Sequence, residues 1–155
     1  MSSSTLPYNV YHKAEPWTGL RPSTDKIIVH IRDLFSTAKE MDTYFRKRGF
    51  FCCGYHYVVT GSGVHVMRHP DSIGAVTDLY DRDTLYVCIL TSESKAAQLP
   101  APLRAHLSEL LDDLQKNHHP NAELLSGPAI LKLKGYEALT TFIEERNKIG
   151  RSGRG

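Results

Sequence analysis

The chain has 155 residues, of which 41% are hydrophobic and 23% are charged, a balance typical of one soluble globular domain. Its formal net charge of +2 is too small to predict nucleic-acid binding from electrostatics alone. No run of apolar residues approaches the roughly 20 that a membrane-spanning helix requires, so we expect no membrane partner.

The beginning of the sequence and its cysteines indicate where the protein folds. Met1 to Thr5 contain no basic segment and no apolar stretch follows them, so the sequence predicts no signal peptide. Cys52, Cys53 and Cys88 form no C-x-x-C pair, and their odd number argues against a disulfide framework. We therefore expect folding in a reducing cytosol, with these cysteines buried as small apolar side chains.

Both ends of the chain differ in composition from its centre. Residues 1–24 are rich in Ser, Thr, Pro and Tyr and predict an extended arm without a core of its own. It contains too many apolar residues for a purely solvated tail, so we expect the arm to pack on the domain or on a partner. Residues 147–155 are rich in Gly and Arg and predict a flexible basic tail. A single domain, residues 25–146, lies between them.

The first predicted elements of the domain are a strand, a helix and a hairpin. Lys26–Ile31 is a β-branched run and predicts a buried strand. Thr37 and Glu40 have capping-box spacing and predict a helix that begins behind Thr37 and ends at Gly49. Two β-rich segments, 55–60 and 63–67, are joined at Gly61-Ser62, which is typical of a hairpin.

The second half adds strands and helices in alternation. Residues 84–90 (TLYVCIL) predict another buried strand. Pro102 predicts the first turn of a helix, whose apolar stripe consists of Leu103, Leu107, Leu110, Leu111 and Leu114. A short strand near 123–125 and a helix near 136–146 complete the order β-α-β-β-β-α-β-α. This order predicts an α/β (α+β) domain with a single mixed sheet flanked by helices.

Several motifs, taken in order, resemble the T7-lysozyme-like N-acetylmuramoyl-L-alanine amidases, whose fold is that of the peptidoglycan recognition proteins. The segments RPSTDKIIVH (21–30) and GYHYVV (54–59) match two strands of that family. Arg68 follows, then GAV (74–76), YD (80–81) and YVCIL (86–90). The resemblance covers roughly residues 20–146 and implies an amidase-like fold.

The resemblance also implies where a zinc site would lie. In that family zinc is held by a histidine that ends the first strand, a second histidine, and a later cysteine or aspartate, and it activates water for amide hydrolysis. His30 matches the first ligand, Tyr55 the cleft tyrosine and His56 a scaffold residue of the cleft floor. The other ligands are expected between the last strand and the last helix, but residues 124–136 contain no His, Cys, Asp or Glu. Val76 replaces the histidine of the family's G-A-H motif.

One imidazole cannot hold a catalytic zinc, which needs three protein ligands. We therefore predict a degenerate, catalytically inactive amidase-fold domain with no metal and no cofactor, in which His30 is the sole remnant ligand. His118 and His119 are poor substitutes because they precede the last strand, on a predicted surface turn. The residues that we expect to bind a partner are Tyr55, Tyr8, Tyr11 and Trp17.

The predicted function is that of a phage-derived structural or interaction module, for instance a virion tail or capsid component whose partners are other phage proteins. Such a protein would be made in the host cytoplasm. Three alternatives stay open. The first is regulation of the phage RNA polymerase, which lysozymes of this family bind. The second is recognition of peptidoglycan fragments without cleavage, and the third is an active amidase with unrecognised zinc ligands.

Overall fold

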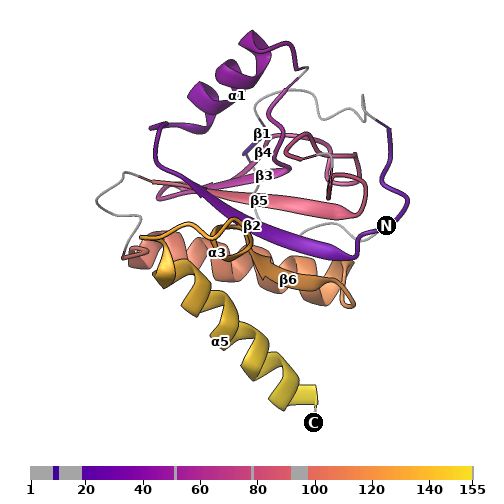
Figure 1. Ribbon diagram of the computed structural model, residues 1–155, viewed down its shortest axis with the longest axis vertical. Coiled ribbons are helices and arrows are strands. Elements are labelled where there is room, and N and C mark those ends of the chain that lie inside the picture. The colour runs from indigo at the N-terminus through magenta and orange to yellow at the C-terminus, as the bar shows by residue number, and fades with distance from the viewer. Residues whose placement is uncertain (1–8, 11–18, 51, 78, 92–97, 155) are drawn as a thin grey trace.

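The structure, a computed structural model, describes residues 9–10, 19–50, 52–77, 79–91 and 98–154 (Figure 1). Its centre is a six-stranded sheet in the order β1-β4-β3-β5-β2-β6. The strands are β1 (Asn9–Val10), β2 (Lys26–Arg32), β3 (Tyr57–Thr60), β4 (Gly63–Val66), β5 (Thr84–Leu90) and β6 (Glu123–Ser126). Among these strands only the β3–β4 pair is antiparallel, so the sheet is mixed, as the sequence predicts.

Helices cover both faces of this sheet. They are α1 (Ala38–Lys47), α3 (Ala101–Asp113), the π-helical turn η1 (Leu114–His118), α4 (Gly127–Ile130) and α5 (Glu137–Arg154). Figure 1 shows α1 on one side of the sheet and α3 and α5 on the other. Every residue of β5 is buried, because a central parallel strand is covered on both faces. The predicted fold class is therefore confirmed.

Strand β2 divides the core into two layers. Its side chains alternate between faces, as in any strand, so Ile27, Val29 and Ile31 pack with the leucines of α3. Ile28 packs in the other layer, with residues of α1 such as Met41. The alternation places His30 and Arg32 on the same face as Ile28, the face that α1 covers.

The local signals in the sequence produce the predicted ends of the helices. The Thr37 hydroxyl accepts a hydrogen bond from the Glu40 amide at 3.1 Å and caps α1. Gly49 follows the helix with a φ of +96°, a conformation that favours glycine. Pro102 lies in the first turn of α3, where the missing amide hydrogen costs nothing.

The flexible tail predicted over residues 147–155 is wrong for 147–154, because α5 continues to Arg154. The contacts of this helix that the structure describes lie before its glycines. The Asn147 side chain donates to the Leu124 carbonyl of β6 at 3.0 Å. Its neighbour Arg146 donates to Gln115 and Asp112 and ties α5 to the end of α3.

Parts of the predicted arm pair with the domain. Asn9 and Val10 form a parallel pair with His65 and Val66 of β4. Further along, the Arg21 amide donates to the Asp71 carbonyl at 2.8 Å. Across the described residues, no helix has the length and apolarity that crossing a membrane requires.

Candidate functional site

A cleft of about 500 Å³ opens at the carboxyl end of β2, on the face that α1 covers. Because β2 and β6 are parallel, the chain that leaves β6 passes the same end of the sheet and forms one wall of the cleft. The segment between β4 and β5 forms the opposite wall. The lining consists of Ile28, His30, Ile31, Arg32, Tyr55, Val76, Thr77, Leu79, Tyr80, Pro128, Ile130, Leu131 and Leu133.

His30 lies at the bottom of this cleft between aromatic rings and backbone. Its ring centroid is 5.7 Å from that of Tyr55 and 5.9 Å from that of Tyr86. Its Nε2 atom is buried and has no hydrogen-bond partner among the described residues. Burial, and secondarily the charge of Arg32, lower the pKa of His30 to about 4, so the ring is neutral at pH 7.

The imidazole of His30 rests directly on the backbone of Gly127, the first residue of α4. A Cβ atom at position 127 would lie 2.4 Å from Nδ1 of His30, closer than non-bonded atoms approach. Only glycine therefore lets α4 begin where it does while His30 keeps its position. This contact seats the start of α4 directly against the end of β2, whose spacing from β6 is set by their parallel pairing.

Tyr55 forms the side of the cleft next to His30. The residue is only 4% exposed, and burial raises the pKa of its phenol above the usual value. The Arg32 guanidinium lies 6.0 Å from the centre of the Tyr55 ring. The structure thus brings together His30 and Tyr55, two of the three residues that the resemblance places in the cleft, and adds Arg32 to them.

His56 does not line the cleft. Its Nδ1 accepts the Tyr86 amide at 2.9 Å, so in the neutral ring Nε2 carries the hydrogen and donates to the Ser72 carbonyl at 2.8 Å. Arg21 donates to the same carbonyl at 2.7 Å. Full burial lowers the pKa of His56 well below its usual value. With both nitrogens engaged, His56 joins β5 to the loop before Gly74 and has no free atom for a ligand.

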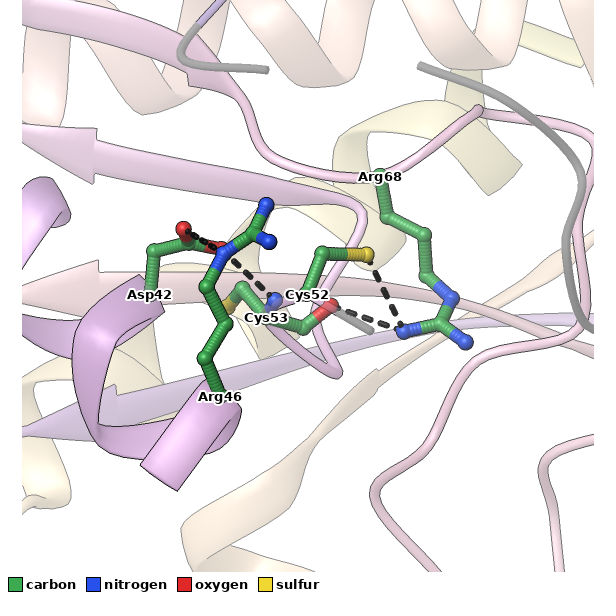
Figure 2. A network of polar contacts seen from close by, with 5 residues as sticks. All are labelled: Asp42, Arg46, Cys52, Cys53 and Arg68. Atoms are coloured by element: carbon green, nitrogen blue, oxygen red, sulfur yellow. Dashed lines mark hydrogen bonds and ion pairs between the residues drawn. The ribbon is translucent and has the colours of Figure 1, made fainter. Parts of the chain in front are cut away.

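A network of buried hydrogen bonds holds the loop that carries Tyr55 (Figure 2). The Asp42 carboxylate of α1 accepts the Cys53 amide at 2.9 Å and the Arg46 Nε at 2.7 Å. From the other side Arg68 donates to the Cys53 carbonyl at 2.9 Å and to the Ile73 carbonyl at 3.0 Å. Both backbone groups of Cys53 are therefore fixed, two residues before Tyr55.

The three cysteines are free, buried thiols. Burial raises the pKa of Cys53 to about 12 and raises that of Cys88 well above the usual value. The Cys52 sulfur lies 3.6 Å from a guanidinium nitrogen of Arg68, but burial outweighs that charge and its pKa is also raised. A nucleophilic cysteine needs a lowered pKa, so these thiols are packing groups.

The donors around His30 do not fit the zinc ion that the resemblance implies. Ser126, at the end of β6, is turned toward Thr140 of α5, and the two hydroxyls are 2.8 Å apart. It also caps α4 by accepting the Ala129 amide. The positive charge of Arg32 opposes a divalent cation at the same place. Within the described ranges, no three His, Cys, Asp or Glu residues are grouped to hold a metal.

The other candidate residues lie elsewhere. His118 follows α3 in η1, and its Nε2 is 3.5 Å from the Asp113 carboxylate, away from the cleft. Tyr8, Tyr11 and Trp17, predicted to bind a partner, lie outside the described residues.

Sequence reasoning missed Arg32 and the aliphatic rim of the cleft. Arg32 is two residues beyond His30 on a strand, and that spacing alone could have placed both side chains on one face. The rim consists of Leu79, Leu131 and Leu133, which are 76%, 58% and 48% exposed. No pattern in the sequence indicates the rim, because it is assembled from two loops roughly 50 residues apart.

Comparison with solved structures identifies the fold. The endolysin N-acetylmuramoyl-L-alanine amidase LysCS of Clostridium intestinale matches with a TM-score of 0.65 and 16% identity, over 85% of this chain and 100% of its own. The Ph2119 endolysin from a Thermus scotoductus bacteriophage matches with a TM-score of 0.58 and 23% identity, over 69% of this chain and 73% of its own. A Drosophila PGRP-LB mutant in complex with tracheal cytotoxin matches with a TM-score of 0.60 and 17% identity, over 74% and 76%.

No model of a protein family and no curated protein matches the sequence. At identities this low, the structural likeness establishes the fold. The chain therefore has the fold of the N-acetylmuramoyl-L-alanine amidases and the peptidoglycan recognition proteins, as its motifs predict.

Replacing Asp42 should destabilise the loop that carries Tyr55. Asp42→Ala leaves the buried Cys53 amide without its acceptor, and we expect it to lower the free energy of unfolding by about 1–3 kcal/mol. Arg46→Met is the matched control, because it removes only the half-exposed ion pair and should cost at most about 1 kcal/mol. Urea denaturation measures both. Equal losses would show that the amide contact contributes nothing.

Gly127→Ala should destabilise the protein because the new methyl group meets the His30 ring. We expect a loss of about 1–3 kcal/mol in the free energy of unfolding, the usual cost of overpacking. The same substitution in a His30→Ala background should cost much less, since the ring is gone. Gly61→Ala is the control, because a methyl group added there would meet no atom within 4 Å. A cost at Gly127 that is independent of His30 would contradict this account.

Proposed function

We propose that this chain is a non-hydrolytic binding module that uses the cleft of the amidase fold without a catalytic zinc. The observation that carries the proposal is the composition of the cleft. Its described lining offers one neutral imidazole, one guanidinium, two phenols and one hydroxyl, and every other side chain in it is aliphatic. Amide hydrolysis by zinc needs three protein ligands and an open position for water, and these groups do not supply them.

Hydrolysis without a metal finds equally little support in the cleft. A nucleophilic mechanism needs a hydroxyl or thiol next to a base that a third group orients. Thr77 is the only aliphatic hydroxyl in the described lining, and its oxygen accepts the Leu79 amide at 3.4 Å. His30 has no carboxylate partner among the described residues to orient its ring. The aliphatic walls instead suit the recognition of an apolar group.

The proposed partners are proteins, and the proposed context is a phage particle, for instance its tail or capsid. The likeness to the endolysin of a Thermus phage agrees with a phage origin. The exposed leucines at the rim of the cleft agree with a protein partner, because adjoining exposed apolar side chains mark interaction surfaces.

Metal analysis combined with an assay of lysis tests the absence of catalysis. After purification in the presence of zinc and gel filtration, we expect far less than one zinc ion per chain by elemental analysis. We also expect no decrease in the turbidity of a peptidoglycan suspension, with LysCS as the positive control. His30→Ala should leave both results unchanged. Near-stoichiometric zinc together with lysis would show that the protein is an active amidase.

A second candidate function is the recognition of peptidoglycan fragments without cleavage. It is favoured by the likeness to a PGRP-LB mutant whose structure contains tracheal cytotoxin, a peptidoglycan fragment, and by Tyr55, which lies at the side of the cleft. This candidate shares the cleft with the first and differs in the ligand.

Calorimetry with soluble muropeptides separates the two candidates. If peptidoglycan is the ligand, muropeptides should release heat on binding, and Leu131→Asp at the rim should weaken their binding about tenfold or more. Leu34→Asp is the control, because Leu34 is 76% exposed and lies outside the cleft. The absence of heat with the wild-type protein, and of co-sedimentation with insoluble peptidoglycan, would dispose of this second candidate.

A further inference from the structure

We propose that the cleft receives the aliphatic C-terminus of a partner polypeptide, whose terminal carboxylate accepts hydrogen bonds from Arg32 and His30. The inference rests on the proposed function, since it requires the cleft to be a binding site that is free of zinc. It goes beyond that function by specifying the chemical groups of the ligand. Three observations carry it: two unpaired nitrogens, one uncompensated positive charge and an aliphatic rim.

The two nitrogens are Nε2 of His30 and Nε of Arg32. Both are buried, and neither has a hydrogen-bond partner among the described residues. They lie two residues apart on β2, so their side chains leave the same face of the strand, roughly 6.6 Å apart along it. Buried polar groups are almost always paired in native proteins, so two unpaired ones in one cleft indicate that a ligand pairs them.

The chemistry of the two nitrogens selects an acceptor. The Nε of Arg32 always carries a hydrogen and can only donate, while Nε2 of a neutral histidine donates in one of its two tautomers. A carboxylate has two oxygens and accepts several hydrogen bonds at once. It can therefore satisfy both nitrogens, which an amide carbonyl with its single oxygen does less well.

The charge of Arg32 favours an anionic acceptor. No described residue in the lining is Asp or Glu, and none of the ion pairs between described residues includes Arg32. Its polar neighbour is the Tyr55 phenol, which is neutral: the guanidinium interacts with the hydroxyl and lies 6.0 Å from the ring centre. One positive charge between largely aliphatic walls matches a single negative charge. A phosphate, with its greater charge and hydration, would require more cationic and polar side chains.

The leucines at the rim of the cleft indicate what kind of molecule bears the carboxylate. Leu79, Leu131 and Leu133 surround the mouth and are 76%, 58% and 48% exposed. Pro128 and Ile130 continue the same surface into the cleft. A volume of about 500 Å³ accommodates a terminal carboxylate with an aliphatic side chain. A small fatty acid would fill the cleft but leave the rim exposed, whereas a polypeptide covers both.

A pair of peptides that differ only at the C-terminus tests the inference. The probes are acetyl-Ala-Leu-Leu as the free acid and as the C-terminal amide, titrated into the full-length protein by calorimetry and by amide NMR shifts. We expect the acid to bind at least about tenfold more tightly than the amide, because hydrogen bonds to a charged group usually contribute that much affinity. The shifts should concentrate at residues 30–32 and 128–133.

Variants assign this preference to Arg32. Arg32→Met keeps the apolar stem and should abolish the difference between acid and amide. Arg104→Met is the matched control, because Arg104 is exposed on α3, on the opposite face of the sheet, and the preference should persist. Leu131→Asp changes a rim residue that is 58% exposed, and it should weaken the binding of the acid about tenfold. Thermal melting confirms that each variant is folded.

Other outcomes would overturn the inference. Equal binding of acid and amide, or no binding of either, would contradict the carboxylate assignment. Octanoate that binds as tightly as the tripeptide acid would assign the cleft to a small amphiphile instead. If neither peptide binds and the protein lacks zinc and lytic activity, this inference fails while the proposed function stands. Stoichiometric zinc with lysis would remove the proposed function itself.

Discussion

The close contact between the His30 ring and the Gly127 backbone sets the geometry of the cleft. The imidazole occupies the space that a side chain at position 127 would need, with only 2.4 Å between Nδ1 and the Cβ position. Beside this contact β6 ends in Ser126, which caps α4, and the chain then passes His30 with apolar side chains. The loop that the resemblance expects to supply metal ligands therefore supplies a hydrophobic wall.

Three buried polar residues outside the cleft have several hydrogen-bond partners each. Arg68 donates to two carbonyls, His56 uses both ring nitrogens, and Asp42 accepts from a backbone amide and from Arg46. These bonds hold the loop of Tyr55 and the strand β5 in fixed positions. By contrast, Nε2 of His30 and Nε of Arg32 stay unpaired inside the cleft, among the residues that the structure describes. These two nitrogens are the basis on which we propose that the cleft binds a ligand.

The sequence allowed the framework to be predicted because its signals are local. Thr37 with Glu40, the Gly61-Ser62 turn and Pro102 each specify an end or a turn within a few residues, and the structure contains all three. The continuation of α5 to Arg154 was not predicted, because Gly150 and Gly153 have low helix propensity, whereas the Asn147 side chain on this helix reaches a carbonyl of β6. Long-range contacts of this kind leave no periodic pattern in the sequence.

The site, too, was predictable only where motifs in the sequence identify its residues. The resemblance placed His30 and Tyr55 in one cleft, and their rings are 5.7 Å apart. It placed His56 on the cleft floor as well, but that ring points into the core and is held by Ser72 and Tyr86. Arg32 was not singled out because it lies outside the motifs that carry the resemblance, the first of which ends at His30. The residues that depart from the family's pattern are the ones that motif matching cannot interpret. In this cleft Arg32 lies beside His30, and Leu131 and Leu133 lie on the segment where the resemblance expects metal ligands. The chemistry of these side chains therefore says more about function than the fold does.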